Sequence, residues 1–157
     1  AAEALERRGW RVEVANRPLA GEARRRGREL GALAATARPD HPMALVLGGE
    51  TTVTVQGPGR GGRCQELALA AALELEGAPP VALLAAGTDG IDGASQNAGA
   101  VVDPTSVDRL VAARVDPLRA LEDNDSGPAF VASGDAVHTG PTGTNVGDLV
   151  LVLMGEL

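Results

Sequence analysis

Apolar residues follow two spacings along the chain, one typical of strands and the other of helices. Continuous apolar runs at 43–47, 81–86 and 149–154 are typical of strands buried on both faces, whereas alternation at 11–15 and 51–55 predicts half-exposed strands. A further short strand is predicted at 100–103, and helical spacing predicts helices at 2–8, 20–37, 65–76 and 105–114. Strands that alternate with helices predict an α/β fold, a layered mixed sheet flanked by helices.

Small residues recur in the helix predicted over residues 20–37, at Ala23, Gly27 and Gly31. A glycine inside a helix costs about 1 kcal/mol relative to alanine. Close packing against another backbone would compensate for that cost. The alternative is an exposed helix that the glycines merely weaken, and the sequence alone favours neither.

A break at residues 39–42, with two prolines, divides the chain into two segments. Residues 1–40 read as a helix, a strand and a second helix, which we expect to pack with the remainder. Residues 41–157 hold the other predicted strands and three glycine-rich loops. We call these the first loop (56–63), the second loop (87–99) and the third loop (134–147).

Composition excludes several classes of protein. The 157 residues are 44% apolar, as in globular proteins, and they contain neither a run of about 20 apolar residues nor a signal segment. The single cysteine, Cys64, makes neither an internal disulfide nor a thiolate-rich zinc site. All fourteen basic residues are arginine, so this chain cannot supply the lysine of a Walker A motif. We therefore expect a soluble, cytoplasmic protein, and the start at Ala1 inside a helix suggests a piece of a longer one.

Charge is distributed unevenly. Residues 1–40 carry a net charge of +3, with a cluster of arginines at 24–28, and residues 41–157 carry −10. A strongly acidic main part would repel a phosphate backbone, so we expect no nucleic acid partner, and no membrane partner either. The arginine cluster is interpreted as a solvated helix face.

The first loop has the features of an anion site. It lies between a predicted strand and a predicted helix, and Arg60 and Arg63 flank Gly61 and Gly62. Free N–H groups at a helix N-terminus and a planar guanidinium both bind carboxylates and phosphates. The same stretch matches Gly-x-Gly-x-x-Gly, a weak sign of dinucleotide binding, but Asp89 follows Gly62 by 27 positions where about 20 is expected. The match is imperfect, but it keeps a dehydrogenase open as an alternative.

The second and third loops are the other candidate sites. Asp89 and Asp92 follow a buried strand, and two carboxylates three apart suit a water-mediated Mg²⁺ ion or a hydroxyl group. They also suit an ordinary turn. The third loop is rich in hydroxyl and amide groups that fit either a polar ligand or plain turn chemistry.

Four motifs together resemble the MOFRL domain, the C-terminal part of the type II glycerate kinases, or glycerate 2-kinases. They read GGETTVTV (48–55), GGRCQELA (61–68), GTDGIDG (87–93) and TGPTGTNV (139–146). The resemblance implies phosphoryl transfer from ATP to D-glycerate with Mg²⁺, giving 2-phosphoglycerate. It also implies a larger two-domain enzyme, whose active site lies in the cleft between this C-terminal fragment and an N-terminal kinase domain. Family members are often called hydroxypyruvate reductases, which restates the dehydrogenase alternative.

The resemblance suggests roles for individual residues. We expect Arg63 to clamp the glycerate carboxylate or the transferring phosphate, and Asp89 to orient the 2-hydroxyl as a base or to bind Mg²⁺. The other substrate- or phosphate-binding candidates are Glu50, Arg60, Gly61, Gly62, Thr88, Thr142 and Asn145, and Asp92 is the second Mg²⁺ candidate.

Two departures from the family and two questions remain at this stage. Cys64 stands where the family usually has Asn, and Gly127-Pro128 follows Asn124-Asp125-Ser126 in place of an aromatic residue. A homodimer is left open. A third alternative is a module that only docks to its partner domain, for which Arg63 and Asp89 would lie far apart.

Overall fold

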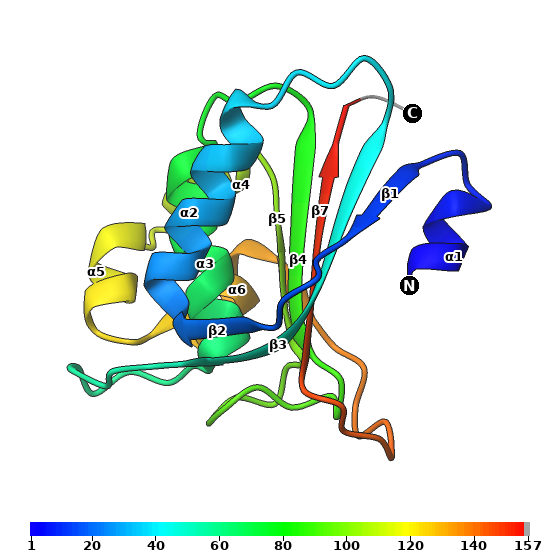
Figure 1. Ribbon diagram of the computed structural model, residues 1–157. Coiled ribbons are helices and arrows are strands. Elements are labelled where there is room, and N and C mark those ends of the chain that lie inside the picture. Colours follow the sequence, from blue (N-terminus) through cyan, green and yellow to red (C-terminus); the bar gives the residue numbers. More distant parts are fainter. Residues whose placement is uncertain (156–157) are drawn as a thin grey trace.

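A mixed sheet of seven strands forms the centre of the computed structural model, which describes residues 1–155 (Figure 1). The strands are β1 (Arg11–Val14), β2 (Leu19–Glu22), β3 (Met43–Thr52), β4 (Val81–Gly87), β5 (Gly99–Val102), β6 (Ala136–Val137) and β7 (Asp148–Met154). Their order is β1-β3-β7-β4-β5-β6, and β2 also pairs with β3. The helices are α1 (Ala2–Glu6), α2 (Ala23–Thr36), α3 (Arg63–Leu75), α4 (Ser106–Ala112), α5 (Pro117–Glu122) and α6 (Ser126–Ser133). The predicted α/β class is confirmed.

Strand directions bring three loops to one edge of the sheet. β7 runs antiparallel between β3 and β4, and its first residue, Asp148, is opposite Gly49 on one side and Gly87 on the other. The end of β3, the end of β4 and the start of β7 therefore lie at the same edge. The first and second loops leave from this edge, and the third loop returns to it.

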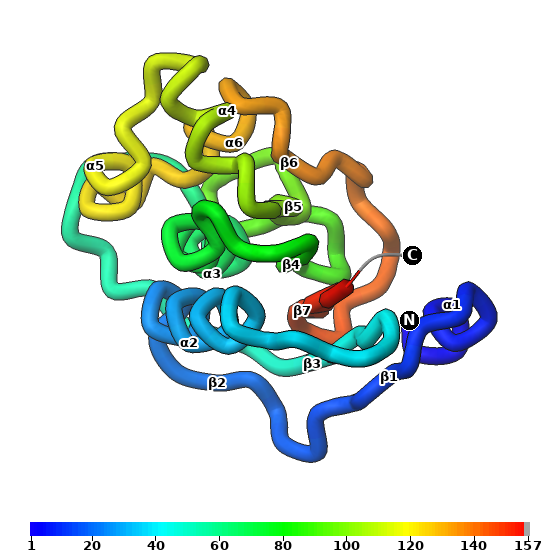
Figure 2. Tube along the Cα trace, turned by 90° about the horizontal axis from the view of Figure 1, so that it is seen from above, coloured from blue at the N-terminus to red at the C-terminus, as the bar shows by residue number. Residues whose placement is uncertain are grey.

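Helices α2 to α6 cover one face of the sheet, with α2 and α3 nearest to it, whereas α1 lies beside β1 and away from the other helices (Figure 2). Alternate residues of β4 and β7, such as Leu83 and Val152, are fully buried beneath them. Leu84 and Leu151 point to the other face and are only partly buried. The prediction that these strands are buried on both faces was therefore wrong for the residues that the structure describes. No helix within residues 1–155 is long and apolar enough to cross a membrane.

Helices α2 and α3 pack backbone against backbone. A Cβ atom on Gly27 would overlap the carbonyl oxygen of Leu67, and one on Gly31 would lie 2.8 Å from the carbonyl oxygen of Ala71. Ala23, four residues earlier on the same line, is fully buried. The structure decides the open question of this helix: the small residues are there for close packing.

Several element boundaries differ from the sequence predictions. Residues 20–22, predicted as the start of a helix, belong to β2. The strands predicted at 43–47 and 51–55 are joined in one continuous β3, which ends at Thr52, so residues 53–55 lie outside it. Gly49, at φ +152°, allows the continuous strand, because any side chain there would collide with the backbone of Leu19 on β2. Helices α5 and α6 and strand β6 had no predicted counterpart. β1 and β2 pair with β3, so residues 1–40 share the sheet of the remainder.

Candidate functional site

The three glycine-rich loops meet at the edge where β7 begins. The first and second loops are joined by the hydrogen bond from Ala94 N to Gly61 O (3.1 Å). The second and third are joined by Val146 N donating to Thr88 Oγ1 (2.9 Å) and by Thr142 N donating to Asp89 O (3.1 Å). Motifs that lie far apart in the sequence thus form one surface.

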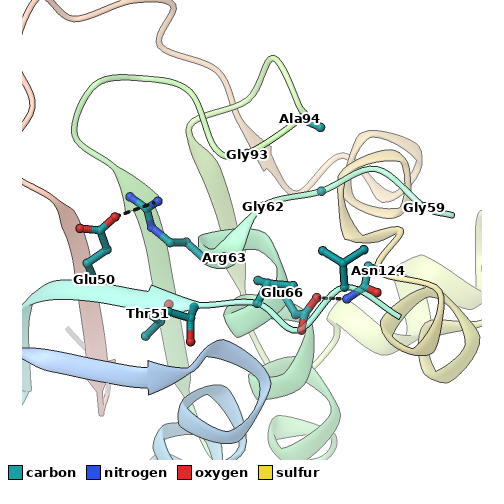
Figure 3. Close-up of a pocket in the computed structure, with 13 residues that line it drawn as sticks. Glu50, Thr51, Gly59, Gly62, Arg63, Glu66, Gly93, Ala94 and Asn124 are labelled. Atoms are coloured by element: carbon teal, nitrogen blue, oxygen red, sulfur yellow. Dashed lines mark hydrogen bonds and ion pairs between the residues drawn. The ribbon is translucent and has the colours of Figure 1, made fainter. Parts of the chain in front are cut away.

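A cavity of about 640 Å³ opens beside the first loop (Figure 3). Its wall is formed by the end of β3, the first loop, the start of α3 and one turn of the second loop. The lining residues are Glu50, Thr51, Thr52, Val53, Val55, Gly59, Gly61, Gly62, Arg63, Glu66, Gly93, Ala94 and Asn124. Four predicted site residues, Glu50, Gly61, Gly62 and Arg63, are among them.

Arg63, the first residue of α3, is oriented by a buried carboxylate. Its Nε and Nη2 atoms donate to Asp148 Oδ2 (2.7 Å) and Oδ1 (2.8 Å), and Nη1 lies 3.2 Å from Glu50 Oε1. The Asp148 side chain is 3% exposed, that of Arg63 32% and that of Glu50 67%. The hydrogen bond to Asp148 raises the pKa of Arg63 above its ordinary value. One side of the guanidinium is therefore fixed, and the other meets an exposed, movable carboxylate.

Asp92 caps the N-terminus of α3. Its two carboxylate oxygens accept from Cys64 N (3.1 Å) and Gln65 N (2.8 Å), and the residue is 2% exposed. Burial raises the pKa of Asp92 to about 6, against the lowering effect of these two hydrogen bonds. The structure thus gives Asp92 a capping role, which uses the oxygens that the sequence interpretation offered to Mg²⁺.

The same cap bears on the dinucleotide alternative. A dinucleotide pyrophosphate binds at free N–H groups of the helix that follows the Gly-rich turn. Here the Cys64 and Gln65 N–H groups already donate to Asp92, an anion of the chain itself. This geometry leaves little of the expected pyrophosphate site at α3.

A buried polar network underlies the cavity. Glu66, also nearly fully buried, accepts from Arg24 Nε (2.9 Å) and Asn124 Nδ2 (2.8 Å). Asn124, at φ +56°, also accepts from Gln56 N (2.7 Å) and Gly57 N (3.0 Å). One asparagine thus connects the start of the first loop to the buried carboxylate. The prediction of a solvated arginine face was wrong for Arg24, whose side chain is mostly buried.

Sequence reasoning missed Asp148, Glu66 and Asn124 as site residues. Asp148 begins an otherwise apolar strand, and Glu66 lies in the first turn of a helix made mainly of Leu and Ala. An acidic residue in such a setting is a usable signal, because buried carboxylates need partners. The partners themselves lie 42 to 85 positions away and are not visible in the sequence.

The remaining candidates do not line this cavity. Thr88, Asp89, Thr142 and Asn145 form the junction of the second and third loops, where Asn145 Nδ2 donates to Asp89 Oδ2 (3.4 Å). Asp89 is two residues beyond Gly87, the strand partner of Asp148, so it belongs to the same edge as Arg63. Arg60 lines a different cavity, on the other side of the first loop.

The carboxylates at this edge of the sheet could contribute to a Mg²⁺ site only together with substrate phosphates. Among residues 1–155, no group of three His, Cys, Asp or Glu side chains is placed to hold a metal ion. Mg²⁺ commonly binds through one or two carboxylates together with substrate phosphates. Asp89 fits that limited role, since its hydrogen bonds from Ile91 N (3.2 Å) and Asn145 leave carboxylate lone pairs free.

The two departures from the family are both accommodated. Cys64 is 1% exposed, and burial raises the pKa of its thiol. Pro128 lies in the first turn of α6, where a proline costs no helical hydrogen bond.

Comparison with known proteins finds relatives that are named glycerate 2-kinases or hydroxypyruvate reductases. The D-glycerate 2-kinase of Thermotoga maritima is 45% identical over 152 residues, covering 94% of this chain and 36% of the relative. The glycerate 2-kinase of Pyrococcus horikoshii is 36% identical, covering 98% and 36%. A putative hydroxypyruvate reductase of Agrobacterium vitis is 44% identical, covering 87% and 33%. The chain therefore spans about a third of the length of these relatives.

A solved structure and a family model agree with these relatives. The crystal structure of a glycerate kinase from Thermotoga maritima superposes with a TM-score of 0.92 at 44% identity, covering 98% of this chain and 38% of that one. The model of the MOFRL family matches residues 43–148. The chain is homologous to the C-terminal part of the glycerate 2-kinases, and it belongs to the MOFRL family.

Proposed function

We propose that this chain is the C-terminal part of an ATP-dependent kinase that phosphorylates D-glycerate to 2-phosphoglycerate, and that it forms one wall of an interdomain active site. The observation that carries the proposal is the Arg63 guanidinium, fixed by Asp148 at the wall of the 640 Å³ cavity. The names of the relatives support the choice of substrate. Their greater length supports a further domain on the other side of the site.

Arg63 is the residue that binds the substrate anion in this proposal. Two donors are committed to buried Asp148, which sets the plane of the guanidinium, and Nη1 pairs with exposed Glu50. The glycerate carboxylate displaces Glu50 from Nη1, and a planar fork suits a carboxylate or a phosphoryl group. Since Asp148 already fixes the orientation, little reorganisation is needed when charge develops in the transition state.

Asp89 orients the 2-hydroxyl of glycerate as a base or contributes one carboxylate to Mg²⁺, while Thr88, Thr142 and Asn145 fix its loop. ATP supplies the phosphoryl group, and Mg²⁺ supplies charge neutralisation when bound. Gly61 and Gly62 leave the cavity wall without side chains, and a Cβ on Gly62 would overlap the Asp92 carboxylate. The lysine that many phosphoryl-transfer sites use must come from outside these residues.

The test is product identification with a full-length protein that contains this chain. The protein is incubated with D-glycerate, ATP and Mg²⁺, and phosphorus NMR identifies the product. We expect 2-phosphoglycerate, and we expect Arg63→Lys to lower kcat/KM about 10²-fold, because lysine keeps the charge beside Asp148 but lacks the fork. Arg119→Ala, at an exposed position of α5, is the matched control and should change little.

Two outcomes would refute the proposal. Absence of a phosphorylated product, with NADH oxidised on addition of hydroxypyruvate, would favour the reductase that the Agrobacterium name suggests. A change in kcat/KM below threefold for a folded Arg63→Lys protein would remove Arg63 from the mechanism.

A further inference from the structure

A second cavity, of about 560 Å³, lies across the first loop from the cavity described above. Its wall is formed by Arg60, one turn of the second loop, residues of α6 and His138, which directly precedes the motif at 139–146. The lining residues are Arg60, Ala94, Ser95, Gln96, Asn97, Gly127, Pro128, Val131 and His138. The proposed kinase mechanism uses no group that faces this cavity.

The charge of the lining residues is unusual for this chain. The whole chain carries a net charge of −7, yet the titratable side chains that line this cavity, Arg60 and His138, are both basic. The nearby Asp125 is not part of the lining, and its carboxylate accepts from the Arg60 backbone N–H (2.8 Å). An anion is therefore the ligand that this wall favours.

Arg60 has a fixed backbone and an uncommitted guanidinium. Its N–H donates to Asp125, and its carbonyl oxygen accepts from Gly127 N (2.9 Å). Across residues 1–155, its guanidinium makes no hydrogen bond or ion pair, whereas Arg24, Arg63 and Arg109 are all paired with carboxylates. The side chain thus extends from an anchored position with all five donors available.

Asn97 provides the independent observation. It is 4% exposed, its backbone N–H donates to Ser95 Oγ (3.2 Å), and its carbonyl oxygen accepts from Asp92 N (2.8 Å). Its side-chain amide has no hydrogen-bond partner in the part of the chain that the structure describes. The fully sealed side-chain atoms that lack a partner there belong to Gln65 and Ser126, so the Asn97 amide keeps some solvent exposure, and Asn97 is one of the residues that line this cavity. Buried amides normally have partners, and a ligand would supply this one.

We propose that the second cavity binds a small oxyanion, a phosphate or a phosphate monoester, between the Arg60 guanidinium and the Asn97 amide. The guanidinium binds two oxygens of the anion, the Asn97 Nδ2 group donates to a third, and His138 lies at the rim. Gly127 lets the Arg60 backbone pack closely against the start of α6, because a Cβ on Gly127 would lie 2.6 Å from the Arg60 carbonyl oxygen. The site is independent of the kinase proposal and would exist whichever reaction the longer protein catalyses.

The experiment is a titration of the chain with inorganic phosphate at constant ionic strength, followed by ¹⁵N NMR. We expect saturable shifts of the Asn97 side-chain amide, the Arg60 Nε and the Gly127 N–H. Arg60→Ala and Asn97→Ala should each weaken binding about tenfold, as expected for losing a hydrogen bond to a charged group. Arg119→Ala is the control, since it removes an exposed arginine that does not line this cavity.

The outcomes separate the proposal from its competitors. Shifts that do not saturate, or that Arg119→Ala weakens as much as Arg60→Ala, would overturn it in favour of diffuse attraction to surface arginines. Shifts confined to Gly61, Gly62 and Arg63 would overturn it in favour of the first cavity. If Asn97→Ala does not fold, the exposed Arg60→Ala carries the comparison alone. A repeat with glycerol phosphate identifies the source of the anion, because a monoester site binds it more tightly than inorganic phosphate.

Discussion

Replacing Arg63 should destabilise the chain more than replacing its partner Asp148, because the two side chains are buried to different extents. Asp148 is 3% exposed, so removing Arg63 leaves a carboxylate buried without its counter-ion. Breaking a buried pair in this way typically costs 3 to 5 kcal/mol. We expect about 3 kcal/mol for Arg63→Met, the lower end, since the Arg63 side chain is 32% exposed and water reaches the pair. Asp148→Asn leaves an arginine that is partly solvated and still beside Glu50, and should cost about 1 kcal/mol.

The double variant Arg63→Met with Asp148→Asn removes both charges and should be more stable than Arg63→Met alone. Urea unfolding of all four proteins, followed by far-UV circular dichroism, gives a double-mutant cycle with an expected coupling of about 2 kcal/mol. Effects that add within about 0.5 kcal/mol would refute the reasoning, as would a larger cost for Asp148→Asn than for Arg63→Met.

Four further predictions concern single residues. Gly27→Ala should lower the free energy of unfolding by about 2 kcal/mol, although alanine is the better helix former by about 1 kcal/mol, because the methyl group has no room against α3; a stabilised variant in urea unfolding would contradict this. For Asp92, burial raises the pKa from 3.8 to about 6 in the folded state, so the folded protein binds the proton more tightly than the unfolded chain does. This group therefore contributes about 3 kcal/mol to the free energy of unfolding below about pH 4, and the contribution is lost as the pH rises through 6. Carboxyl NMR should show that midpoint, Asp92→Asn should abolish this part of the pH dependence, and a midpoint below 4 would disprove the assignment. Asn124→Ala should cost about 2 kcal/mol through the lost hydrogen bonds to Gln56 and Gly57, and Asn124→Gly, which suits φ +56°, should still be less stable than the unchanged chain in the same assay. Cys64 should react with a thiol reagent only after unfolding, because the thiolate is the reactive form and burial raises the thiol pKa; rapid labelling of the folded chain would argue against its burial.

Local patterns predicted the regular elements well where one spacing dominated. β4 and α3 were found to within two residues at each end, since six apolar residues in a row, or a run of thirteen residues of which twelve are strong helix formers, leave few alternatives. β2 was missed, because residues 19–22 become a strand only through pairing with β3. Helices α5 and α6 were also missed, since each has fewer than nine residues and shows no clear helical spacing.

For the site, the sequence identified the loops but not the connections between them. Glycines and arginines at 57–63 predicted a site beside α3, and the cavity there is lined by Arg63 and its neighbouring glycines. The sequence did not indicate that Asp92 caps α3, because helix capping across 28 positions depends on how two loops meet. Nor did it indicate that Arg60 and Arg63 face different cavities, which follows from the backbone bonds that Arg60 makes with Asp125 and Gly127.

The sequence by itself determined the α/β class, the positions of the glycine-rich loops and the resemblance to the MOFRL domain, because these depend on residue type and on spacing within short windows. Only the tertiary structure decided which carboxylate pairs with which arginine, since Arg63 and Asp148 meet solely because β7 inserts between β3 and β4. Burial then decided the protonation energetics of the individual carboxylates. An aspartate in a glycine-rich loop suggests a solvated turn residue, but Asp92 is a buried helix cap whose pKa is raised to about 6. Neither pairing nor burial is a property of a local sequence window, because both arise from residues that only the folded sheet brings together.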